Sequence, residues 1–236
     1  IQIWAGEALV LEGQVDGSVI TGERQALYGT KASAGTLLIG DQSQTNRSWS
    51  PTDIVVTDDP VLLADDLSNL DEFYQSGSVK TAYLSSDLLN DSGMGTIGLY
   101  APGDFTLEEG VALKLDPGAA LTINAPITQG ATVTINGTIE THGGSITIQG
   151  GLDTISLGAN AVLDVSGMWI NGLTDTVSGA KSAIDGGTIT IAKGKTGGVI
   201  LAEEGARLDV SGGGWVTSDG SAISVAAGDG GAISLN

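Results

Sequence analysis

Leu163-Asp164-Val165-Ser166-Gly167 is the stretch that decides the fold of this chain, because the same five residues return as Leu208-Asp209-Val210-Ser211-Gly212. The two copies lie 45 residues apart. A looser copy, Leu-Lys-Leu-Asp-Pro-Gly, begins at Leu113, 50 residues before Leu163. Internal repetition at such a period is typical of solenoids, in which each repeat buries its apolar face only against its neighbours.

A second motif keeps nearly the same period. Gly-Gly-Ser-Ile-Thr-Ile at 143–148 returns as Gly-Gly-Thr-Ile-Thr-Ile at 186–191, and again as Gly-Gly-Ala-Ile-Ser-Leu at 230–235. These offsets are 43 and 44 residues. Two motifs with one period are hard to obtain by chance, even in a chain with 37 glycines.

Apolar doublets, two apolar residues separated by one other residue, recur from residue 96 onward. Successive residues of a strand point to opposite faces, so each doublet places two side chains on one face. Gly, Asn, Asp and Ser between the doublets tolerate the backbone angles of tight corners. The doublets fall at 97/99, 105/107, 113/115, 121/123, 133/135, 146/148, 155/157, 163/165, 189/191, 208/210, 223/225 and 233/235.

This spacing predicts an all-β fold, a parallel β-helix with coils of about 20 residues. The 43–45-residue repeat then holds two coils, and Leu163 and Leu208 share one aliphatic column with a single coil between them. A β-sandwich also has strands at this spacing, but it does not repeat one phrase at a fixed offset.

Three regions of one continuous solenoid are predicted, within a longer protein. Residues 1–41 form its first coils, 42–95 form a partly helical excursion packed on its side, and 96–236 form regular coils. Helices are expected at 65–75 and at 86–90, the latter capped by Ser85 or Ser86.

The charge and composition exclude several classes of partner. The chain has 28 acidic and 9 basic residues, a net charge of −19. Nucleic acids and anionic membrane surfaces would therefore repel it, and it has no apolar run long enough to span a bilayer. It has no cysteine, which excludes disulfides and thiol-based sites.

The sequence contains few motifs that would indicate a catalytic or metal site. His142 is the only histidine, with Glu140 as its only nearby partner in sequence, and is predicted to be a solvated turn residue. No catalytic triad order, phosphate-binding loop or zinc pattern occurs, so we predict no catalytic residues and no cofactor. Ca²⁺ held by Asp65, Asp66, Asp71 and Glu72 stays open as an alternative, although their spacing matches no known calcium loop.

Two tryptophans follow the repeated phrase at nearly equal places. Trp169 lies six residues after Leu163, and Trp215 lies seven residues after Leu208. Such rings can stack on sugar faces, which makes both residues candidates for glycan contact. The competing interpretation, which we favour, is that each ring covers the corner of its coil.

The order and spacing of several glycine-rich phrases resemble the internal region of filamentous-haemagglutinin-like large exoproteins, the secreted partners of bacterial two-partner secretion systems. The resemblance covers most of the chain. The phrases that carry it lie at 22–25, 35–40, 88–95, 103–107, 121–126, 137–148, 166–171 and 208–216.

The resemblance implies a right-handed parallel β-helix and a non-catalytic, extracellular role at the bacterial surface. The expected function is a structural and adhesive shaft in attachment, aggregation or biofilm matrix formation. Expected partners are surface or matrix polysaccharide, other cells, and the outer-membrane transporter during secretion. Open strand edges at the ends also favour lateral or end-to-end self-association.

Two alternatives remain. β-Helices also host polysaccharide lyases and hydrolases, which makes a carbohydrate-active enzyme the first alternative. The second is the stalk of a contact-dependent toxin-delivery protein, which some members of the resembled family form.

Overall fold

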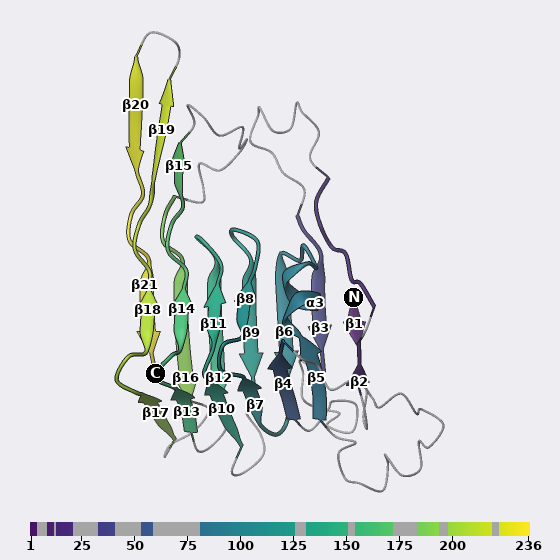
Figure 1. The fold of residues 1–236 in the computed structure, drawn as a ribbon. Helices are drawn as coiled ribbons and strands as arrows, with labels where there is room; N and C mark the ends of the chain where they lie inside the picture. Colours follow the sequence, from purple (N-terminus) through teal and green to yellow (C-terminus); the bar gives the residue numbers. More distant parts are fainter. Residues whose placement is uncertain are drawn as a thin grey trace, which may run out of the picture.

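The computed structural model describes residues 1–3, 9–11, 13–20, 33–40, 53–58, 81–125, 131–150, 154–171, 184–193, 198–218 and 222–236. These residues are mostly β-strand, arranged in three parallel sheets and one small mixed sheet (Figure 1). All-β character, which the sequence predicted, is confirmed.

The first sheet, sheet A, has seven strands, all paired in parallel. In spatial order they are β1 (Gln2–Ile3), β3 (Thr36–Ile39), β6 (Thr96–Tyr100), β9 (Ala120–Asn124), β12 (Ser145–Gly150), β16 (Thr188–Lys193) and β21 (Ala232–Leu235). Spatial order follows sequence order throughout, so this sheet grows in one direction along the chain.

Sheet B is also parallel and has seven strands, and sheet C is parallel and has four. Sheet B runs β2 (Leu9–Val10), β5 (Thr81–Ser85), β4 (Asp53–Thr57), β7 (Phe105–Leu107), β10 (Thr132–Ile135), β13 (Thr154–Leu157) and β17 (Val199–Ala202). Sheet C runs β8 (Ala112–Lys114), β11 (Thr138–Glu140), β14 (Val162–Asp164) and β18 (Arg207–Asp209).

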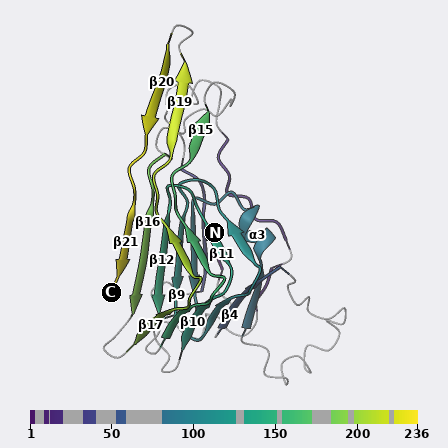
Figure 2. The same cartoon turned by 60° about the vertical axis from the view of Figure 1, so that its left-hand side comes forward.

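From β7 onward the chain visits sheet B, then C, then A, and returns to B. We call one such circuit a coil. Each coil places its strands beside the matching strands of the coil before it, so residues far apart in sequence become neighbours (Figures 1 and 2). In sheet C, for example, Leu113, Ile139, Leu163 and Leu208 are consecutive partners.

The core consists of the inward-facing aliphatic residues of these strands. Leu113, Ile139 and Leu163 have no exposed surface, and Leu208 on the last coil is half-buried. Each such side chain contributes roughly 1.5–3 kcal/mol relative to leaving it exposed. Most predicted doublets lie on this face, but 223/225 does not, because its residues belong to the small mixed sheet.

The predicted coil length is wrong for the last part of the chain. Leu163 pairs directly with Leu208, and Ile146 pairs directly with Ile189, so the 43–45-residue repeat is one coil rather than two. Leu113 and Leu163, in contrast, have the coil of Ile139 between them. The extra residues of the long coils that the structure describes leave the stack, which apolar spacing alone does not reveal.

Those extra residues form sheet D, with β15 (Trp169–Asn171), β19 (Gly214–Ser218) and β20 (Ile223–Ala227). β15 and β19 are parallel, while β19 and β20 form an antiparallel pair. We call sheet D and the described residues that link it to the stack (166–171, 184–187, 211–218 and 222–231) the arm. Both views show it projecting beyond the stack, next to the last coils (Figures 1 and 2).

Glycines allow the arm to leave the stack. The arm joins the stack at a narrow point that we call the neck. There the Gly187 N–H donates to the Val165 carbonyl and the Gly231 N–H donates to the Val210 carbonyl, both at 2.7 Å. A side chain on Gly167 would overlap the carbonyl of Ile184. The close backbone approach therefore requires glycine there.

The segment 42–95 is described in part, at 53–58 and 81–95. β4 and β5 are internal strands of sheet B, and their residues Ile54 and Leu84 are fully buried, so these parts belong to the stack rather than to its side. Their order is inverted, since β5 lies nearer the N-terminal end of the sheet than β4.

A short helix, α3 (Ser86–Asn90), has the bounds that the sequence predicts, with Ser85 at its N-cap position. The Ser85 side chain makes no capping hydrogen bond. The helix expected at 65–75 lies outside the described residues.

Asn90 of α3 covers the first edge of sheet C. Its Nδ2 donates to the Ala112 carbonyl at 3.0 Å, and its Oδ1 accepts from the Lys114 N–H at 2.7 Å. One side chain thus occupies two of the backbone groups of β8 that a preceding parallel strand would use. The opposite edge of the sheet, at β18, has no paired strand among the described residues.

Candidate functional site

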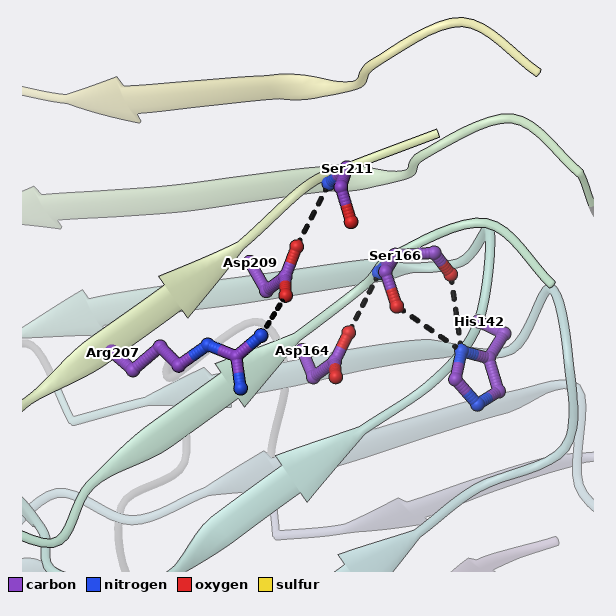
Figure 3. A network of polar contacts seen from close by, with 6 residues as sticks. All are labelled: His142, Asp164, Ser166, Arg207, Asp209 and Ser211. Carbon is purple, nitrogen blue, oxygen red and sulfur yellow. Dashed lines mark hydrogen bonds and ion pairs between the residues drawn. The ribbon is translucent and has the colours of Figure 1, made fainter. Parts of the chain in front are cut away.

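The repeated Leu-Asp-Val-Ser-Gly phrase forms a corner at the end of a sheet C strand. Oδ1 of Asp164 accepts a hydrogen bond from the Ser166 N–H at 2.8 Å, and Oδ1 of Asp209 accepts one from the Ser211 N–H at 2.9 Å (Figure 3). A carboxylate that binds the backbone two residues later replaces part of a turn. The Asp of the phrase therefore stabilises the turn in both copies.

These corners bring acidic residues into line. Glu140, Asp164 and Asp209 are consecutive partners on the outer face of sheet C, and Lys114 precedes them. Neighbouring strands are about 4.8 Å apart, so the carboxylates repel one another unless each has its own partner.

Asp209 has such partners. The hydrogen bonds donated by the Ser211 N–H and hydroxyl lower the pKa of the Asp209 carboxyl below its usual range, and Arg207 lowers it further. Arg207 also forms an ion pair with Oδ2 of the same carboxylate. The ionised form of Asp209 is therefore the form that the folded corner favours.

His142 joins two coils at the neighbouring corner. Its Nε2 lies 2.9 Å from Oε1 of Glu140 on its own coil. Its Nδ1 lies 3.1 Å from the carbonyl oxygen of Ser166 on the next coil, and 3.4 Å from the Ser166 hydroxyl oxygen (Figure 3). The sequence predicted a turn position with Glu140 nearby, but not the contact with Ser166, which requires the stacking of two coils.

The cluster of Glu140, His142 and Ser166 has the residue types of a hydrolytic triad, so its chemistry needs a specific test. A base must accept the hydroxyl proton at an unprotonated ring nitrogen. The Ser166 carbonyl is the nearer of the two oxygens and can only accept, so a hydrogen bond to it needs a proton on Nδ1. This contact does not place Nδ1 to take the Ser166 hydroxyl proton, and what the geometry shows is a polar link between two neighbouring coils.

The structure separates the two candidate glycan residues. Trp169 on β15 is 66% exposed, and its ring occupies the space where a side chain on Gly214 would lie. Trp215 on β19 packs instead against Ile170 and Ile184 on the other face of sheet D. Of the two, Trp169 is the one whose ring is open to a ligand.

The acidic calcium candidates, Asp65, Asp66, Asp71 and Glu72, lie outside the described residues. Among the residues that the structure describes, no three His, Asp or Glu side chains are placed to hold a metal ion. Within the same ranges, no helix has the length and apolar character needed to cross a membrane.

Comparison of the chain with protein-family models, with curated proteins and with solved structures finds no match. The interpretation of the site therefore depends on its own geometry.

Proposed function

We propose that the chain is part of a right-handed parallel β-helix that serves as the structural and adhesive shaft of a secreted bacterial fibrous exoprotein. Its role would be attachment, aggregation or biofilm matrix formation, without catalysis. The observation that supports this most directly is the in-register stacking of like side chains through three parallel sheets.

A shaft needs length and solubility, and the described coils favour both. Each added coil extends a stack by about 4.8 Å while burying its apolar residues against the coil before. The net charge of −19 favours the solubility of such a body. The resemblance to filamentous-haemagglutinin-like exoproteins, seen in the order of the glycine-rich phrases, points to secretion and to polysaccharide or cell surfaces as partners.

Engineered disulfides test the stacking, because the natural chain has no cysteine. Thr147 and Thr190 are direct partners on β12 and β16, so the pair Thr147→Cys and Thr190→Cys should oxidise to a disulfide. The control pair, Thr122→Cys and Thr190→Cys, has one strand between its members and should stay reduced. Cross-linking of the control pair but not of the first would contradict the stacking.

Adhesion needs a separate test. The chain immobilised on beads should retain bacterial-surface polysaccharide and whole cells, compared with beads coated with an unrelated protein of similar negative charge. Equal retention on both kinds of bead would contradict the adhesive role. Release of new reducing ends from acidic polysaccharides incubated with the chain would instead favour the enzyme alternative.

A further inference from the structure

The exposed face of the arm is unlike the rest of this acidic molecule. Residues paired across neighbouring strands share a face of the sheet, and so do alternate residues of one strand. Trp169 pairs with Gly214, Val216 lies two residues further along the same strand and pairs with Val225, and Ile223 lies two residues before Val225 on β20. The side chains of Trp169, Val216, Ile223 and Val225 therefore lie on one face of sheet D.

That face presents apolar groups to solvent. Trp169, Ile223 and Val225 are 66%, 66% and 67% exposed. The opposite face carries Ile170 and Trp215, which pack with Ile184 into a small core. A sheet usually buries at least one face and sends polar residues to the other, so a second apolar face is the unusual feature.

Charge distinguishes this face further. The described residues of the arm contain only two charged side chains, Asp185 and Asp229, within a chain whose net charge is −19. Both lie at the neck, where Oδ1 of Asp185 accepts the Asp229 N–H at 2.8 Å. Two copies of the chain repel each other over their acidic surfaces, and the three strands of sheet D contain no charged residue that would add to this repulsion.

The arm also has an open edge. β20 pairs with β19 on one side, and no described strand pairs with its other side. An exposed strand with apolar side chains is a template for another strand. The arm projects from the stack, so two arms can meet while the acidic stacks stay apart (Figures 1 and 2).

From these observations we propose that the arm is a self-association site, at which the outer edge of β20 pairs antiparallel with β20 of a second copy. The exposed faces of the two arms then join into one apolar surface. This goes beyond the proposed adhesive shaft and does not depend on it. A neutral saccharide stacked on Trp169 is the competing occupant of the same face.

Sedimentation velocity over a concentration series tests the association. The parent chain should form a concentration-dependent dimer that strengthens with added salt, because salt screens the repulsion between two acidic copies. The variant carrying Ile223→Lys and Val225→Lys should stay monomeric with an unchanged melting temperature, since both side chains are exposed.

The matched control places the same two charges elsewhere. Val199→Lys and Leu201→Lys alter exposed apolar residues of β17, the last described strand of sheet B, and should leave the dimer intact. Loss of the dimer in the β17 variant but not in the β20 variant would move the contact to the end of the stack and overturn the proposal. A parent chain that stays monomeric at every concentration and salt level would also overturn it.

A single cysteine substitution on β20 tests the geometry of the proposed contact between two copies. Val225 is the middle residue of β20, so antiparallel pairing of two copies brings it next to itself. Val225→Cys should therefore oxidise to a covalent dimer, whereas Val199→Cys should not. If Val225→Cys stays uncross-linked and Trp169→Ala abolishes binding of a neutral oligosaccharide to a monomeric chain, the face is a saccharide site and the proposal is wrong.

Discussion

At the scale of single residues, two kinds of position hold this molecule together. Inward aliphatic residues such as Leu163 stack on their counterparts in the coils before and after. Corner aspartates such as Asp209 turn the chain by accepting a backbone N–H. The first kind stabilises the fold by burying apolar surface, and the second stabilises the turns. Truncation of a side chain tests the first kind, and a change of pH tests the second.

Replacing Leu163 by alanine should lower the free energy of unfolding by about 2–5 kcal/mol, because the cavity lies between two neighbouring coils. Leu163→Asp should cost more, since it buries a charge without a partner. Leu201→Ala is the control, at a side chain that is 48% exposed, and should have little effect. Urea unfolding followed by circular dichroism measures all three. A Leu163→Ala variant as stable as the parent would show that Leu163 does not pack between its counterparts in neighbouring coils.

The lowered pKa of Asp209 makes stability depend on pH. The folded corner favours the carboxylate, so its contribution is present above the unfolded pKa of about 4 and is lost as pH falls toward the folded value. Asp209→Asn keeps an oxygen acceptor but cannot ionise. Unfolding by urea at pH 6 and pH 3 should therefore show a smaller difference for the variant than for the parent. An equal pH dependence in both chains would contradict this.

At the scale of elements, the long coils and the short coils differ most in the length of the connection between sheets C and A. In the short coils a tight turn connects them, as where the Gly144 N–H donates to the Thr141 carbonyl at 3.0 Å. In the long coils the same corner opens at a glycine neck and continues into sheet D. An arm is thus an insertion at a corner and leaves the stacked strands in register.

The neck glycines should be intolerant of a side chain. Gly167→Ala places a methyl group against the Ile184 carbonyl and should cost about 1–3 kcal/mol, because the backbone itself must move. Gly230→Ala is the matched control, since its new atom would lie 3.7 Å from the nearest neighbour, the Val210 carbonyl. Thermal melts of the two variants should differ, and equal melting temperatures would show that the neck is not closely packed.

Asn90 is expected to hold the first edge of sheet C in place. Asn90→Ala removes both hydrogen bonds to β8, and Asn90→Asp keeps only the acceptor for the Lys114 N–H. Amide hydrogen exchange at Lys114 should therefore be fast in the alanine variant and intermediate in the aspartate variant. Unchanged protection in both would mean that α3 does not cap this edge.

At the scale of the whole molecule, the strand edges of the described stack are not equally covered. The first edge of sheet C is covered by α3, while the last coil leaves Ile233 and Leu235 exposed at 45% and 59%. In a stack whose coils contact only their neighbours, stability is lowest where one neighbour is missing.

Hydrogen exchange should show this gradient. Amides of the central strands β9, β12 and β13 should be protected longest, and those of β18 and β21 should exchange first, because no described strand pairs with their outer edges. Mass spectrometry of peptides from each strand measures the order. Uniform protection along the chain would indicate a single cooperative unit without weak ends.

The sequence by itself determined the stacked parallel strands and their corners. Alternating apolar residues fix which side chains face inward, and the Asp-Val-Ser phrase fixes where the chain turns, since both effects act within a few residues. The helix at Ser86–Asn90 was predicted for the same reason.

Only the tertiary structure decided how many coils a repeat contains, because the Leu163–Leu208 interval is the same length whether its middle stays in the stack or leaves it. It also decided the inverted order of β4 and β5, the contact of His142 with Ser166, and the exposure of Trp169 but not Trp215. Each of these depends on which distant segments become neighbours, and that is set by packing between coils rather than by local sequence.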